Sequence, residues 1–120
     1  MNKFEVELPW PARALSPNVR VHWAVESKAK KKFRSDCYYA TRAAKASASG
    51  PVTLSFTFNP PHNRSYDKDN LIAQMKSGID GIADALGIDD KHFDIGSVEL
   101  GGRVEGGIVR VLIMQNEERV

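Results

Sequence analysis

The sequence predicts an α+β fold in one domain, with a mixed sheet of about four strands and two helices packed on it. Residues 52–58 alternate strictly between apolar and polar side chains and are β-branched or aromatic, which is typical of a half-buried strand. Residues 25–47 and 69–86 repeat apolar side chains every three or four positions, as amphipathic helices do. A chain of 120 residues has room for one such domain.

The first strand is predicted at residues 4–8, where apolar and charged side chains alternate. Pro9 and Pro11 end this strand, because proline has no N–H to donate to a sheet. A loop over residues 12–23 then leads into the first helix. The apolar stripe of this helix consists of Ala29, Phe33, Cys37, Ala40 and Ala44.

The second helix keeps its apolar side chains on one face, although Gly78 and Gly81 lower its helix propensity. Two strands follow, at residues 95–104 and 108–114, and the glycine-containing segment between them predicts a hairpin. The resulting order is βαβαββ, which implies a mixed sheet with packed helices. The apolar face of the second helix consists of Leu71, Met75, Ile79, Ile82 and Leu86.

The composition excludes several classes of protein. Hydrophobic residues make up 42% of the chain and charged residues 27%, which is typical of a globular protein rather than a disordered one. A single cysteine, Cys37, excludes an internal disulfide and a thiolate zinc cluster. The first residues lack the pattern of a signal peptide, and no apolar run is long enough to cross a bilayer. We therefore expect a cytoplasmic protein with no membrane partner.

Charge is divided unevenly along the chain. Residues 13–45 carry nine Lys or Arg against two acids, Glu26 and Asp36. A basic part that contacts a polyanion, together with an acidic part that holds a metal, is what a phosphodiesterase needs. Two oppositely charged solvated faces are the alternative that composition alone favours. The acidic residues gather beyond Tyr66, at Asp67, Asp69, Asp80, Asp84, Asp89, Asp90 and Asp94.

The most informative segment is Tyr66-Asp67-Lys68-Asp69-Asn70-Leu71, which places two carboxylates one residue apart at the start of a predicted helix. Residues two apart in extended chain point the same way, so Asp67 and Asp69 can face one cation. Mg²⁺ takes oxygen ligands and keeps several waters, so two or three carboxylates and a phosphate suffice. The structural alternative is that one of these aspartates simply caps the helix.

Other polar residues can extend this site. On a helical wheel Asp69, Lys76 and Asp80 fall within roughly 40° of one another. Lys76 could therefore hold a scissile phosphate or offset charge in the transition state, and an ion pair with Asp80 is the alternative. Asp89 and Asp90 follow the predicted helix end, where the chain turns toward the sheet and can bring one carboxylate back.

These motifs resemble those of the RusA-type Holliday-junction resolvases, a family common in prophages. Leu8-Pro9-Trp10-Pro11 matches the family's Leu-Pro-Trp-Pro strand end, and Ser16-Pro17-Asn18 resembles the loop after it. Asp67-Lys68-Asp69-Asn70-Leu71 matches the family's most specific motif, Asp-x-Asp-Asn-Leu, and Ile88-Asp89-Asp90 resembles the apolar-Asp-Asp that supplies a third acid. The resemblance covers nearly the whole chain and implies one RusA-like endonuclease domain over residues 1–120.

The resemblance implies a metal site formed by Asp67, Asp69 and Asp90, which binds Mg²⁺, with Mn²⁺ as a possible substitute. These acids and Lys76 would be the catalytic residues, and no nucleotide cofactor is implied. The family commonly has a lysine four residues after the second motif aspartate, where this chain has Ala73. An insertion of three residues, nearly one helical turn, would return Lys76 to about the same face.

The function implied by the resemblance is Mg²⁺-dependent hydrolysis of DNA at four-way (Holliday) junctions, in recombination and repair. A homodimer would cut two opposed strands symmetrically, because a twofold junction presents two equivalent bonds. The protein would be cytoplasmic and encoded by a bacterium or phage. Contacts to phosphates are expected from the basic residues Arg13, Arg20, Lys28, Lys30, Lys31, Lys32, Arg34 and Arg64.

Other interpretations stay open. The chain could be a non-catalytic phage protein that binds branched DNA, or a metal nuclease that acts on RNA, since phosphate contacts distinguish the sugars poorly. Trp10 and Trp23 could wedge against bases, although core packing is the commoner use of such tryptophans. A zinc site is disfavoured by the wide separation of the histidines, His22, His62 and His92.

Overall fold

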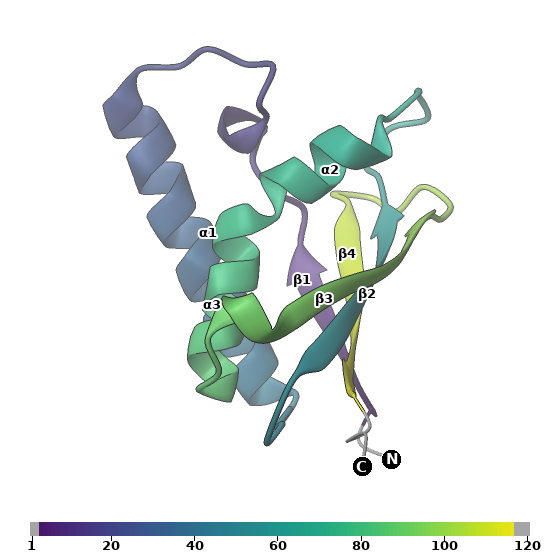
Figure 1. The fold of residues 1–120 in the computed structure, drawn as a ribbon. Helices are drawn as coiled ribbons and strands as arrows, with labels where there is room; N and C mark the ends of the chain where they lie inside the picture. The colour runs from purple at the N-terminus through teal and green to yellow at the C-terminus, as the bar shows by residue number, and fades with distance from the viewer. Residues whose placement is uncertain (1–2, 117–120) are drawn as a thin grey trace.

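Four strands form one mixed sheet in the computed structural model, which describes residues 3–116. β4 pairs antiparallel with both β1 and β2, whereas β2 and β3 are parallel. The predicted α+β fold with a mixed four-stranded sheet is confirmed. The strands are β1 (Lys3–Pro9), β2 (Val52–Asn59), β3 (Phe93–Leu100) and β4 (Ile108–Gln115), in the spatial order β1-β4-β2-β3 (Figure 1).

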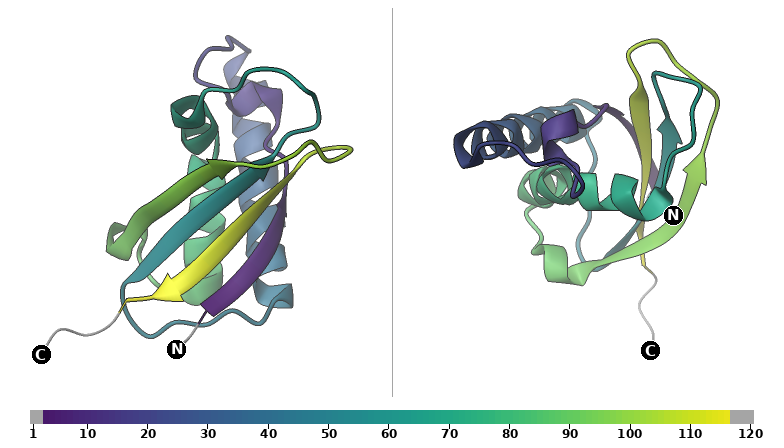
Figure 2. Two further views of the ribbon diagram at one scale, coloured as in Figure 1. Left: turned by 90° about the vertical axis from the view of Figure 1, so that its right-hand side faces the viewer. Right: turned by 90° about the horizontal axis from the view of Figure 1, so that it is seen from above.

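Three helices cover one face of this sheet (Figure 2). They are α1 (Trp23–Ala43), α2 (Lys68–Gln74) and α3 (Lys76–Leu86). The parallel pair β2 and β3 requires a long crossover, which α2 and α3 provide. No helix in the described part of the chain is long and apolar enough to cross a membrane. Two short 3₁₀ helices, η1 (Arg13–Leu15) and η2 (Asp90–His92), precede α1 and β3.

The core lies between the helices and the sheet. Alternate residues of β2 are buried against the helices, while the residues between them, such as Thr53 and Thr57, are only half-buried on the other face. From α1, Phe33 and Cys37 enter this core, and burial raises the pKa of the Cys37 thiol to about 12. Cys37 is therefore a packing residue rather than a nucleophile. The buried sheet residues are Val6, Leu8, Val52, Leu54, Phe56, Phe58, Val109, Val111 and Ile113.

Two glycines allow α3 to approach α1 closely. A Cβ at Gly81 would collide with the carbonyl oxygen of Arg34. A Cβ at Gly78 would lie 2.5 Å from the Cε2 atom of Phe33 and 3.0 Å from the Sγ atom of Cys37. The low helix propensity of these residues is thus offset by tight helix–helix packing.

The predicted second helix is divided in two at Met75. The Met75 N–H donates to the Ile72 carbonyl, a 3₁₀ bond, and α2 therefore leaves α3 at a visible angle (Figure 1). Met75 is fully buried at the bend, and the helices on both sides still bury Leu71 and Ile82. A continuous helix over residues 69–86 was the wrong expectation, because burial of both halves against the sheet overrides helical continuity.

The predicted hairpin is also wrong, because β2 lies between β3 and β4 in the sheet. The connection between them still turns through Gly106 and Gly107, which have φ values of 76° and 71°. At the other end of the fold α1 stops at Ala43 rather than at residue 47. Lys45 has a left-handed backbone with φ 56°, which is incompatible with a continuing helix.

Candidate functional site

The motif aspartates stand at the N-terminus of α2. Asp67 is the N-cap: its Oδ1 atom accepts hydrogen bonds from the N–H groups of Asp69 at 2.8 Å and Asn70 at 3.3 Å. The capping alternative is therefore correct for Asp67. Asp69 lies in the first turn of α2, and both side chains are exposed to solvent. Both capping bonds use the Oδ1 atom of Asp67, which leaves its Oδ2 atom available to a ligand.

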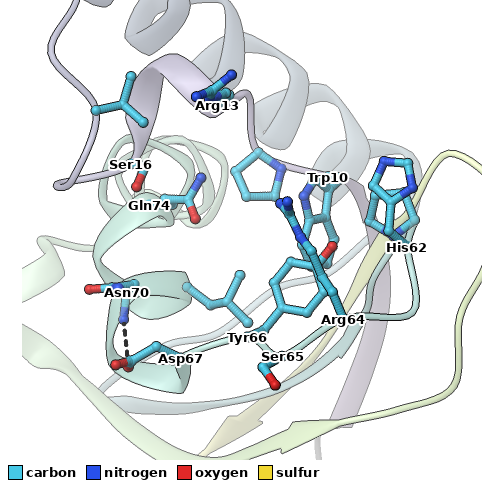
Figure 3. A pocket seen from close by; sticks show the side chains of 14 residues that line it. Trp10, Arg13, Ser16, His62, Arg64, Ser65, Tyr66, Asp67, Asn70 and Gln74 are labelled. Atoms are coloured by element: carbon cyan, nitrogen blue, oxygen red, sulfur yellow. Dashed lines mark hydrogen bonds between the residues drawn. The ribbon is translucent and has the colours of Figure 1, made fainter.

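A cleft of about 690 Å³ opens beside Asp67 (Figure 3). It lies between the segment that follows β1, the loop that precedes α2, and α2 itself. The Tyr66 ring packs edge-to-face against Trp10, with 5.7 Å between centroids, and the Arg64 guanidinium lies 5.0 Å from the Tyr66 centroid. The polar and aromatic walls of the cleft include Trp10, Arg13, Arg64, Tyr66, Asp67 and Gln74.

A second group of charges gathers beside α3, in a groove of about 410 Å³ that we term the acidic groove. The Lys76 Nζ atom lies 3.9 Å from the Oδ2 atom of Asp90, in the ion pair that the structure gives Lys76. Arg34 binds Asp84 through two hydrogen bonds of 2.7 and 2.9 Å. The acidic groove is lined by Arg34, Asp80, Ala83, Asp84, Gly87, Ile88, Asp89 and Asp90.

The carboxyl groups of the acidic groove differ in their environments. Burial raises the pKa of Asp80; Lys76 and Arg34 oppose this shift, and the nearby Asp90 carboxylate adds to it. The hydrogen bond from Arg34 lowers the pKa of Asp84. Burial thus disfavours the charged form of Asp80, and a carboxyl of this kind in a groove is a candidate for function.

The three acids that the resemblance groups together do not converge within one chain. Asp69 lies in the first turn of α2, whereas Asp80 lies in α3 beyond the bend at Met75, and Asp90 lies near Asp80. Within residues 3–116 no three His, Cys, Asp or Glu side chains come close enough together to hold a metal ion. The expectation that Asp67 and Asp69 face one cation from extended chain is wrong, because Asp69 is helical and of the two only Asp67 lines the cleft. The two still supply the one or two carboxylates with which proteins bind Mg²⁺ beside a substrate phosphate. Asp90 does not join them.

The basic residues divide by place. Arg13 and Arg64 line the cleft, and Arg34 belongs to the acidic groove. Two lysines of α1 make i,i+4 ion pairs on the surface, Lys30 with Glu26 at 2.9 Å and Lys32 with Asp36 at 2.6 Å. Exposed ion pairs of this kind are worth little and leave the charge accessible. The remaining expected DNA contacts, Arg20, Lys28 and Lys31, are exposed before and along α1.

The first turns of α1 extend beyond the sheet (Figure 1). Trp23 begins this helix with 75% of its surface exposed, whereas Trp10 is half-buried against Phe58 and Tyr66. His22 caps the same helix, since its Nδ1 atom accepts the N–H of Ala24 at 3.1 Å. Trp10 thus packs against the core, whereas Trp23 is exposed.

Sequence reasoning missed two features of the site. Arg34 was expected to contact DNA, yet its bidentate partner is Asp84, fifty residues away in the chain. The aromatic wall of the cleft also depends on a distant contact, between Trp10 and Tyr66. The one local signal for this aromatic wall is the position of Tyr66 directly before Asp67 in the sequence.

Comparisons with known proteins add a relative but no activity. No family model matches the chain. A protein of Xylella fastidiosa (strain Temecula1 / ATCC 700964), described as an "Uncharacterized protein", is 46% identical over 91 residues. The match covers 72% of this chain and 60% of that protein, so the chain spans less than two thirds of its relative's length.

Proposed function

We propose that the chain is a Mg²⁺-dependent endonuclease that resolves four-way DNA junctions as a homodimer in the cytoplasm. The observation that carries this proposal is the Asp67-Lys68-Asp69-Asn70-Leu71 motif at the exposed start of α2, on the edge of a cleft that also presents Arg13 and Arg64. Carboxylates beside cationic side chains suit a phosphodiester substrate. The exposed lysines of α1 add positive charge for the duplex arms.

The roles of the residues follow from their places. Arg13 and Arg64 would bind phosphates and orient the strand in the cleft, as guanidinium groups do through paired hydrogen bonds. Asp67 and Asp69 would hold the metal, with Asp67 fixed in position by its capping bonds. When bound, Mg²⁺ would supply charge stabilisation and an activated water. Lys76 is engaged with Asp90, so its role would be to balance charge in the acidic groove.

Cleavage of a synthetic four-way junction, compared with linear duplex of the same sequence, tests the proposal. Reactions with and without Mg²⁺ at two salt concentrations separate catalysis from electrostatic binding. The variant Asp69→Asn should lose at least about 100-fold in cleavage rate while binding the junction as well as the wild-type protein does. Asp94→Asn, an exposed aspartate outside both sites, is the matched control. Cleavage by Asp69→Asn at the wild-type rate would contradict the metal assignment.

A non-catalytic protein that binds branched DNA is the second candidate. It is favoured by the separation of Asp90 from the motif aspartates and by its pairing with Lys76. A gel shift with four-way junctions that yields no Mg²⁺-dependent product would select this function.

A further inference from the structure

The cleft beside Asp67 has the dimensions and chemistry of a site for one small planar ligand. Its volume of about 690 Å³ lies within the usual range for ligand pockets, about 300–1,000 Å³. The walls combine aromatic rings, two guanidinium groups and the side-chain amides of Asn70 and Gln74. Among residues 3–116, Asp67 is the one carboxylate in the lining of the cleft, so positive charge exceeds negative charge there.

The Tyr66 hydroxyl supplies a second, independent observation. This Oη atom is buried and has no hydrogen-bond partner among residues 3–116. Buried tyrosine hydroxyls are normally paired, because an unpaired polar group loses its hydration without compensation. A ligand in the cleft would therefore supply the hydrogen-bond partner that the Tyr66 hydroxyl lacks within residues 3–116.

Arg64 provides a way to expose that side chain. Its guanidinium lies over the Tyr66 ring and reaches across the cleft in Figure 3. Arg64 itself is exposed and comes from a loop, so its side chain is free to turn toward a phosphate. Such a turn would uncover the face of the Tyr66 ring, beside the edge-on ring of Trp10.

We propose that this cleft binds a single unpaired nucleotide of a DNA strand. The base stacks on the face of the Tyr66 ring, a sugar or phosphate oxygen of the same strand accepts a hydrogen bond from the Tyr66 hydroxyl at the ring edge, and Arg13 and Arg64 bind the flanking phosphates. The inference deepens the proposed function and rests on it, because an unstacked nucleotide is available where strands exchange at a junction. A phosphodiester next to the bound nucleotide then lies beside Asp67, the first aspartate of the motif.

The test measures binding without metal, so that it is independent of cleavage. Fluorescence anisotropy in EDTA compares a labelled oligothymidylate with a duplex of the same length at fixed ionic strength. The wild-type protein should bind the single strand at least as tightly as the duplex. Arg64→Ala should weaken single-strand binding about 5- to 50-fold, through loss of a phosphate contact and of the stacked arrangement.

Tyr66→Phe is the sharper variant, because it removes one unpaired hydroxyl and leaves the ring. It should fold as stably as the wild-type protein and yet bind the single strand about 2- to 10-fold more weakly. The matched control is Arg42→Ala, whose guanidinium lies 5.9 Å from the Tyr38 centroid on α1, outside the cleft. This variant removes the same charge and the same type of contact, and it should bind within about twofold of the wild-type protein.

The outcomes separate the two proposals. Single-strand binding that Arg64→Ala and Tyr66→Phe leave unchanged would overturn the nucleotide site, whether or not the protein cuts junctions. An equal loss in Arg42→Ala would also overturn it, because charge alone would then explain the effect. Binding that depends on the cleft, in a protein that cuts no junction, would support the nucleotide site and count against the nuclease.

Discussion

Replacing Gly81 by alanine tests the packing that positions the acidic groove. The added Cβ would collide with the carbonyl oxygen of Arg34 and stand 3.0 Å from its carbonyl carbon and 3.1 Å from the nitrogen of Tyr38. All of these are main-chain atoms of α1, so no change of rotamer relieves the overlap. The two helices have to separate, and their interface loses contacts along its length.

The expected loss of stability follows from two opposing effects. Overpacking costs about 1–3 kcal/mol, and more where the main chain has to move. The higher helix propensity of alanine returns up to about 1 kcal/mol. We expect the free energy of unfolding to fall by about 2 kcal/mol, which lowers the Tm of a domain of this size by about 8 °C.

Urea unfolding followed by circular dichroism measures this change. Gly50→Ala is the matched control, because a Cβ there meets no atom within 4 Å. That variant should remain within about 0.5 kcal/mol of the wild-type protein. Gly78→Ala should fall between the two, since the nearest atom is in the Phe33 side chain, which can shift. Equal stability of Gly81→Ala and Gly50→Ala would refute the close approach of α1 and α3.

Two further predictions concern aspartates. Asp67→Ala removes both capping bonds and should lower the free energy of unfolding in urea by about 1 kcal/mol. Asp67→Asn should keep the cap and lose only the charge. Cleavage that survives in Asp67→Asn would count against a metal role for Asp67. Asp80→Asn should raise stability at neutral pH, because the folded state disfavours the Asp80 charge. This gain should be complete above the raised pKa and vanish below the ordinary value of 3.8, and a gain that persists under acid conditions would contradict its electrostatic origin.

The sequence predicted the elements of the fold better than their pairing. Alternation located β2 almost to the residue, because one face of that strand is buried throughout. The order of strands was not predictable in the same way. A glycine turn between two strands suggests a hairpin. In the structure β2 pairs with β3 on one side and with β4 on the other, and so separates these two strands.

The candidate site was predictable as a motif and not as a geometry. Periodicity placed the acids on a helix but could not show the bend at Met75, because a buried methionine fits a continuous stripe equally well. The contacts that shape both sites join distant parts of the chain, as Trp10 meets Tyr66 and Arg34 meets Asp84. No local pattern carries such information.

The bend at Met75 also bears on whether Lys76 replaces the lysine that the family commonly has where this chain has Ala73. An insertion of three residues returns a side chain to its face only if the helix is straight. Here Lys76 is the first residue of α3, beyond the bend, and its charge lies near Asp90 and Asp80. Lys76 and Arg34 still leave Asp80 with a raised pKa, so the fold tolerates an unfavourable charge in the acidic groove. A carboxyl with a raised pKa in a groove is a feature that functional sites share with structural ion-pair networks, so the acidic groove is a candidate for a second part of the site, separate from the cleft beside Asp67.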